Sequence, residues 1–114
     1  MDATLTIDAG RKIGELRPLH GIDNGPVCFG AKIDSTPLYR AAGFPFIRLH
    51  DTNFPHPREV DIPQVFPDAA ADETDPRNYV FGPTDTYLRQ CLDTGARIIY
   101  RLGTSIEHTR EKLF

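Results

Sequence analysis

The stretch Phe44-Pro45-Phe46-Ile47-Arg48-Leu49-His50 decides the fold that this sequence predicts. It is dense in aromatic and β-branched residues, which is typical of a strand buried within a sheet. Residues 97–102, RIIYRL, have the same character, and the mostly apolar residues 16–22 predict a further short buried strand. We therefore expect three buried strands, each separated from the next by residues that favour a helix.

Both intervening helices have start and stop signals. Ser35-Thr36-Pro37 supplies a cap and a proline suited to the first turn, and Gly43 is a natural end. The second helix opens at residues 82–85 and closes at Gly95, with one apolar face formed by Tyr87, Leu88, Cys91 and Leu92. Strands that alternate with helices predict successive βα units and hence a parallel sheet in the α/β class.

Two segments lie outside this alternation. Residues 4–8, TLTID, alternate polar and apolar side chains before the turn signal Ala9-Gly10, which predicts an outer strand. Residues 52–79 show little periodicity and contain five of the ten prolines, so we expect a long loop, and long loops are often functional. Its acidic part, residues 68–75, lacks the spacing of a calcium loop and predicts a solvated surface.

Composition excludes several classes of protein. The chain has 114 residues, enough for one domain, and its net charge of −3 includes no basic stripe of the kind that binds nucleic acid. No run approaches the roughly 18 apolar residues of a membrane helix, and the first residues do not form a signal peptide. We expect neither a nucleic-acid partner nor a membrane partner, and the cellular location stays open.

The sequence contains no fingerprint of a cofactor or a metal. The glycine patterns of dinucleotide-binding folds and of P-loops are both absent. Cys28 and Cys91 lie far apart and have no zinc-type spacing with the histidines, and His56 has no metal-type partner either. We expect two reduced, partly buried thiols, no cofactor and no metal site.

Polar residues follow each predicted strand, at the position where parallel α/β folds bind and react. Because the carboxyl ends of parallel strands meet at one edge, these side chains should form a rim. Such a rim suits a sugar, whose hydroxyls need paired donors and acceptors. The candidate substrate-binding residues are His50, Asn24, Asp51, Arg101 and Glu107.

Each candidate also has a purely structural explanation. Asn24-Gly25 is a common turn dipeptide, and His50 beside Asp51 is compatible with a satisfied pair at a strand end. Arg101 and Glu107 could form a salt bridge at the rim. Two carboxylates can catalyse glycoside hydrolysis, but nothing in the sequence places Asp51 or Glu107 in the apolar setting that a catalytic acid needs. Residue chemistry alone leads to a polar, sugar-sized rim.

Four motifs carry a resemblance to a known family: HGIDNGP at residues 20–26, FIRLHD at 46–51, NYVF at 78–81 and YRLGTSIEH at 100–108. In this order they are similar to the opening of glycoside hydrolase family 39, which includes β-xylosidases and α-L-iduronidase. The resemblance implies that residues 16–114 are the first three βα units of a (β/α)8 TIM barrel, an incomplete catalytic domain. Residues 1–15 would then contribute a strand to an accessory β-domain.

The same resemblance locates the catalytic groups outside this chain. Family members place the acid/base glutamate after an asparagine at the fourth strand and the nucleophile at the seventh, and residues 1–114 contain no Asn-Glu pair. We expect the N-terminal part of a retaining exo-glycosidase that is inactive by itself and contains no catalytic residue. His50 would line the pocket and donate a hydrogen bond to a sugar hydroxyl, while Asp51 or a backbone carbonyl fixes its tautomer.

Two other functions remain open, a non-catalytic carbohydrate-binding or assembly fragment and a small independent α/β domain. Three strands alone would leave an unpaired sheet edge. Besides a carbohydrate, we therefore expect as partner either the remaining barrel segment or a second copy of the chain.

Overall fold

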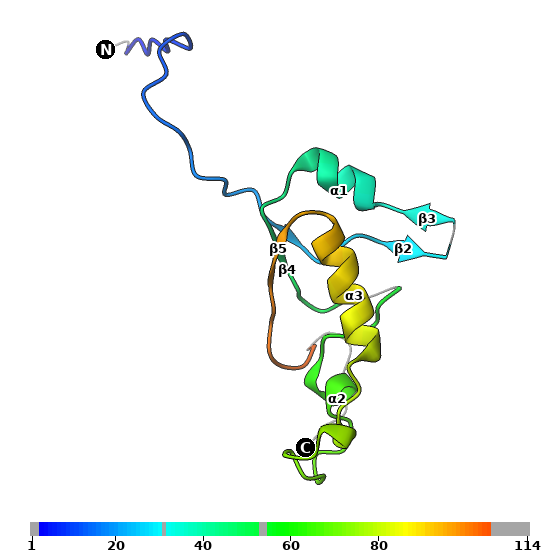
Figure 1. Ribbon diagram of the computed structural model, residues 1–114. Coiled ribbons are helices and arrows are strands. Elements are labelled where there is room, and N and C mark those ends of the chain that lie inside the picture. The colour runs from blue at the N-terminus through cyan, green and yellow to red at the C-terminus, as the bar shows by residue number, and fades with distance from the viewer. Residues whose placement is uncertain (1–2, 31, 53–54, 106–114) are drawn as a thin grey trace.

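Three short parallel strands form the centre of the molecule (Figure 1). The computed structural model describes residues 3–30, 32–52 and 55–105. Strand β4 (Phe46–Arg48) lies between β1 (Ile22–Asp23) and β5 (Arg97–Ile99), and it runs parallel to both. The predicted parallel sheet is thus confirmed, although each strand is shorter than its apolar stretch. Ile47 is the only strand residue of this sheet that is buried. The buried strand predicted over residues 16–22 was therefore wrong in its extent and its burial, since Leu16 and Leu19 are 98% and 85% exposed and do not pair with a neighbouring strand.

Helices α1 (Thr36–Ala42) and α3 (Gly82–Asp93) form where their signals predict them. Helix α1 ends at Gly43, which has a φ of 65° and donates its N–H to the carbonyls of the last turn. The two helices pack against each other, and Arg40 Nε donates to the carbonyl of Asp93 over 2.7 Å. They connect β1 to β4 and β4 to β5, and both lie against the same face of the sheet.

The core lies between that face and the helices. Ile47 and Leu49 of the central strand region are both 0% exposed, whereas Arg48 is exposed and His50 is half-buried. This confirms the alternation expected of a strand, in which successive side chains point to opposite faces. The core consists of Ile47, Leu49, Val60, Tyr87, Cys91 and Ala96.

Two features were missed by the sequence analysis. Strands β2 (Cys28–Phe29) and β3 (Ile33–Asp34) form an antiparallel hairpin ahead of α1. Residues 52–79 contain a short helix α2 (Ile62–Val65) and a 3-10 helix η1 (Pro76–Asn78), so this segment has more structure than a plain loop. Ile62 N donates to Gly103 O over 2.9 Å, which ties the segment to the residues that follow β5.

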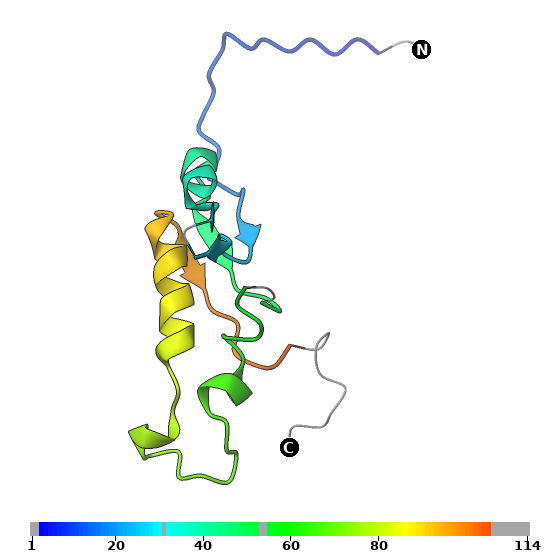
Figure 2. The same ribbon diagram turned by 90° about the vertical axis from the view of Figure 1, so that its right-hand side faces the viewer.

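The strand predicted over residues 4–8 does not form, and that prediction was wrong. Leu5 and Ile7 are 85% and 80% exposed, and residues 3–17 extend away from the packed part of the molecule (Figures 1 and 2). Alternation along a strand stabilises it only when a neighbouring strand pairs with it and buries one face, and the described residues provide none here. The accessory β-domain that the resemblance implies stays a prediction.

The extended N-terminal segment also determines the overall dimensions. The Cα radius of gyration is 19.9 Å, against about 13 Å for a compact domain of about 100 residues. The packed part begins near β1. Among the helices within the described residues, none has the length and apolar character required to cross a bilayer.

Candidate functional site: a polar rim at the carboxyl ends of the strands

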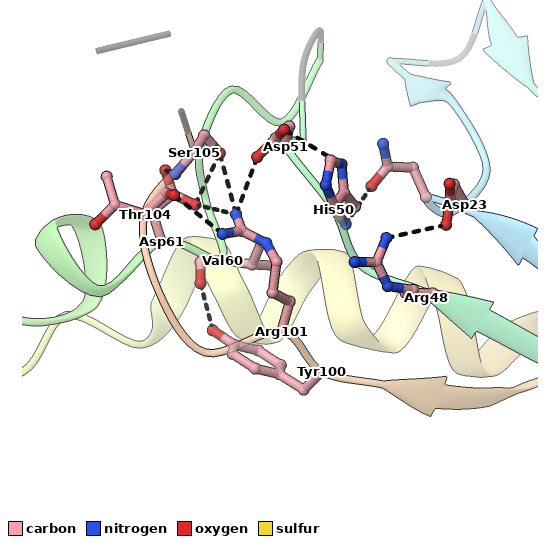
Figure 3. A network of polar contacts seen from close by, with 11 residues as sticks. Asp23, Arg48, His50, Asp51, Val60, Asp61, Tyr100, Arg101, Thr104 and Ser105 are labelled. Atoms are coloured by element: carbon pink, nitrogen blue, oxygen red, sulfur yellow. Dashed lines mark hydrogen bonds and ion pairs between the residues drawn. The ribbon is translucent and has the colours of Figure 1, made fainter. Parts of the chain in front are cut away.

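Four of the five predicted site residues come together where the parallel strands end (Figure 3). Asn24 follows β1, His50 and Asp51 follow β4, and Arg101 follows β5. Contacts connect them in the order Asn24, His50, Asp51, Arg101. The fifth candidate, Glu107, lies outside the described residues, as does the salt bridge predicted between it and Arg101.

Asn24 forms the turn after β1 and also contacts the candidate site. Its φ of 62° is in the left-handed region, which asparagine tolerates better than most residues. Its N–H donates to the carbonyl of Arg48 over 2.8 Å, and its side-chain Oδ1 accepts from the N–H of His50 over 3.0 Å. Asn24 is therefore both a turn residue, as its structural explanation expects, and a neighbour of the candidate site residue His50.

Gly25 allows this turn to approach the core. A Cβ at this position would lie 2.3 Å from Cys91 Sγ, so no larger residue fits without a shift. The N–H of Gly25 donates to the hydroxyl oxygen of Tyr87 over 2.7 Å. The β1 turn is thus anchored directly on α3.

His50 and Asp51 form a close pair at the end of β4. His50 Nδ1 lies 3.2 Å from Asp51 Oδ2, and their side chains are 40% and 10% exposed, respectively. Asp51 has a φ of 44°, an uncommon conformation for a residue that is not glycine. The imidazole is therefore partly accessible, while the carboxylate beneath it is nearly enclosed.

Arg101 binds two carboxylates at once. Its Nη2 is 3.2 Å from Asp51 Oδ1 and 3.1 Å from Asp61 Oδ1, and it also donates to Ser105 Oγ. Its Nη1 donates to the carbonyl of Thr104 over 3.0 Å. A planar guanidinium with several donors is well suited to bridge groups in this way.

Asp61 is the residue of this network that the sequence analysis missed. Its side chain is only 2% exposed, and it accepts hydrogen bonds from Ser105 N and Ser105 Oγ, each over 2.9 Å. One signal was present, because Asp61 precedes Ile62-Pro63, and an aspartate followed by proline is typical of a helix start. That signal indicates a cap, however, and not a contact with a residue far along the chain.

Within residues 3–30, 32–52 and 55–105, three non-glycine residues have positive φ values, and all three lie in the segments that follow β1 and β4. They are Asn24, Asp51 and Arg58. Strained backbone persists only where the surrounding structure holds it, and it is concentrated at functional sites. The distribution of strain therefore points to the same edge as the polar side chains.

Two hollows flank the rim. One of about 420 Å³ lies on the helix-free face of the sheet, lined by Asp23, Phe46, Arg48 and Ile99 among others, and Arg48 Nη1 is 3.5 Å from Asp23 Oδ1. The other, of about 260 Å³, is lined by Arg58, Asp61, Pro63, Gln64, Pro67 and Thr104. The second hollow shares Asp61 and Thr104 with the network, whereas the first runs along the sheet face and is also lined by Pro18 and Leu19.

His56 has a structural environment. Its ring stacks on Tyr87 with centroids 4.4 Å apart, its Nδ1 is 2.6 Å from Glu59 Oε2, and the residue is 8% exposed. Across residues 3–30, 32–52 and 55–105, no set of three or more His, Cys, Asp or Glu is arranged to hold a metal ion.

Both cysteines are free thiols, as predicted. Burial raises the pKa of Cys91 to about 12 and also raises the pKa of Cys28. A protonated, buried thiol is a poor nucleophile. Cys91, which is completely buried, is therefore not a candidate for covalent chemistry.

Comparisons of the chain with protein-family models, with curated proteins and with solved structures give no match. The likeness to family 39 therefore stays a prediction based on the four motifs.

Proposed function

We propose that this chain supplies the first three βα units, and part of the sugar-binding rim, of a retaining glycosidase with a (β/α)8 barrel. The observation that carries the proposal is the contact network that joins Asn24, His50, Asp51 and Arg101 from three successive strand ends. Catalytic sites of such barrels lie at this edge, and their residues come from several different strands.

The arrangement of the helices favours a barrel fold and argues against a doubly wound open sheet. Doubly wound folds have helices on both faces of the sheet, whereas a barrel has all of its helices outside. Here α1 and α3 share one face, and the opposite face includes the hollow beside Arg48 and the half-exposed Ile99. In a complete barrel that open face would be the interior.

The chain's own residues would bind the sugar and not cleave it. Asp51 and Asp61 are both engaged by Arg101, so neither carboxylate is free to attack the anomeric carbon or to protonate a leaving oxygen. Double displacement needs two further carboxylates about 5–5.5 Å apart. In this proposal they come from strands beyond residue 114.

Binding and hydrolysis assays on the chain test this proposal. We expect no release of nitrophenol from nitrophenyl pentosides or hexosides. Titration with the corresponding free sugars should shift the backbone NMR signals of Asn24 and His50, and His50→Ala should abolish the shifts. Turnover that Glu107→Gln removes would contradict the proposal.

The alternative functions give different results in the same experiments. If the rim binds sugar but the longer protein that contains it hydrolyses no glycoside, the chain is a carbohydrate-binding fragment. Sedimentation analysis separates the third possibility, since the open face and sheet edge predict association with a second copy or with the rest of the barrel. A monodisperse monomer with one sharp melting transition and no sugar binding would indicate an independent α/β domain.

A further inference from the structure

Asp61 is a fixed anchor beneath the rim. It comes from the start of α2, and its nearly enclosed carboxylate accepts three hydrogen bonds, two from Ser105 and one from Arg101. A carboxylate is buried at low cost only when its oxygens are hydrogen-bonded and its charge is paired. Both conditions hold for Asp61, so these contacts hold its side chain in place.

Arg101 transmits this fixed position to Asp51. The same Nη2 that contacts Asp61 also contacts Asp51 Oδ1, and the Thr104 carbonyl holds the other terminal nitrogen. With four partners on a rigid fork, Ser105 Oγ being the fourth, the guanidinium cannot rotate without losing several contacts. It therefore holds Asp51, whose positive φ requires support from its surroundings.

Asp51 in turn determines the proton position on His50. One of its oxygens is bound to Arg101, and the other faces His50 Nδ1 over 3.2 Å. A carboxylate oxygen at this distance favours the tautomer in which Nδ1, the nitrogen that faces it, carries the proton. In the neutral ring Nε2 is then left with its lone pair.

We propose that Asp61 is a positioning residue: acting through Arg101 and Asp51, it holds neutral His50 with Nε2 as a hydrogen-bond acceptor for a ligand hydroxyl. This proposal rests on the proposed sugar-binding function for the identity of the ligand. It also reverses the direction of the hydrogen bond expected from the sequence, since the hydroxyl donates and the ring accepts. Substrates that present a hydroxyl at this point would be preferred over their deoxy or O-methyl analogues.

The tautomer of His50 can be measured without any ligand. Long-range ¹H–¹⁵N spectra distinguish protonated Nδ1 from protonated Nε2, at a pH well above the usual histidine pKa of about 6.5. In the full chain we expect a single Nδ1-protonated form. Asp61→Asn should change it to a mixture of tautomers or to the Nε2-protonated form. Asp75→Asn is the matched control, because it breaks an exposed Asp75–Arg77 pair in the same long segment.

A second variant covers the case in which Asp61→Asn does not fold. Arg101→Lys retains the charge but replaces the planar fork by a point charge, so it should loosen Asp51 and mix the His50 tautomers in a folded chain. Restoring the Nδ1-protonated form by Asp61→Glu would support positioning through the carboxylate. An unchanged tautomer in a folded Asp61→Asn or Arg101→Lys variant would overturn the proposal.

Failure of this proposal and failure of the proposed function give different results. If sugars bind at the rim while the His50 tautomer ignores Asp61, only the positioning role is wrong. If the tautomer responds to Asp61 but no sugar shifts the His50 signals, the positioning role stands and the ligand is not a sugar.

Discussion

On the face of the sheet that α1 and α3 cover, Ile47 and Leu49 are completely buried, whereas on the opposite face Ile99 is 50% exposed. Both kinds of residue alternate along the same short strands. The covered face pairs apolar side chains with Tyr87 and Cys91 of α3, and the open face leads to polar groups at the rim. One set of strands therefore separates the residues that stabilise the fold from those that lead to the rim by the direction of their side chains.

This separation makes clear which substitutions should affect which property. Removing apolar volume from the covered face should lower the free energy of unfolding, because close-packed interiors leave cavities when side chains are truncated. Removing a polar rim group should affect ligand binding while the fold persists.

Leu49→Ala should give the largest effect, a loss of about 2–5 kcal/mol in the free energy of unfolding. Leu49 is 0% exposed, and the helices over it cannot collapse fully into the space left. Ile99→Ala, on the open face, is the matched control and should cost under about 1 kcal/mol. Urea denaturation followed by circular dichroism measures both. Equal losses for the two variants would show that the open face is covered in solution.

His50→Ala tests the open face of the sheet, which leads to the rim. In a protein that also carries the catalytic carboxylates, we expect it to cost about 2–4 kcal/mol in kcat/KM, as for a hydrogen bond whose partner is left unpaired. The melting temperature should barely change, because a 40% exposed ring contributes little to the core. Kinetics and melting measured on the same variant decide the matter. A large loss of stability with unchanged kinetics would make His50 a structural residue.

Gly25→Ala tests the point where the two sides meet, since the Asn24 turn contacts the rim and Gly25 contacts α3. The added Cβ would lie 2.3 Å from Cys91 Sγ, and overpacking of this kind costs about 1–3 kcal/mol. The double variant Gly25→Ala, Cys91→Ala should lose less stability than the sum of the two single changes. Strict additivity in denaturant melts would mean that the turn and the helix are not in contact.

The sequence predicted the covered face well because its signals are local. The glycine at the end of α1, the proline near the start of α3 and the alternation around Ile47 all act within a few residues. The N-terminal prediction failed for the complementary reason, since alternation at residues 4–8 carries no information about a pairing strand. The β2–β3 hairpin was missed because two-residue strands are too short to show a period.

The rim was predicted only in part, again because local sequence patterns carry no information about long-range contacts. Asn24, His50, Asp51 and Arg101 each follow a recognisable strand, so topology alone brings them to one edge. Asp61 reaches the same edge from within a proline-rich segment, and its partners Arg101 and Ser105 lie 40 and 44 residues further along the chain. Such a contact depends on how the long segment folds back, which no local pattern encodes.

Alkaline pH should give the smallest effect, and it acts mainly on the covered face. Burial raises the pKa of Cys91 to about 12, and burial is also the largest cause of the raised pKa values of Tyr39, Tyr87 and Tyr100. These four side chains belong to the core or pack against it, and they are neutral when protonated.

The sign follows from linkage. For Cys91 the folded pKa lies above the unfolded value of about 8.5, so its contribution to stability is complete below that pH and is lost as pH rises toward 12. The urea midpoint should therefore be flat near neutral pH and should fall above about pH 9. Cys91→Ala should remove part of this fall, whereas His50→Ala should leave it unchanged, because His50 is on the open side. A fall of equal steepness in the wild-type chain and in Cys91→Ala would mean that Cys91 is already accessible to solvent, and that the covered face is less tightly closed than the packing of α3 indicates.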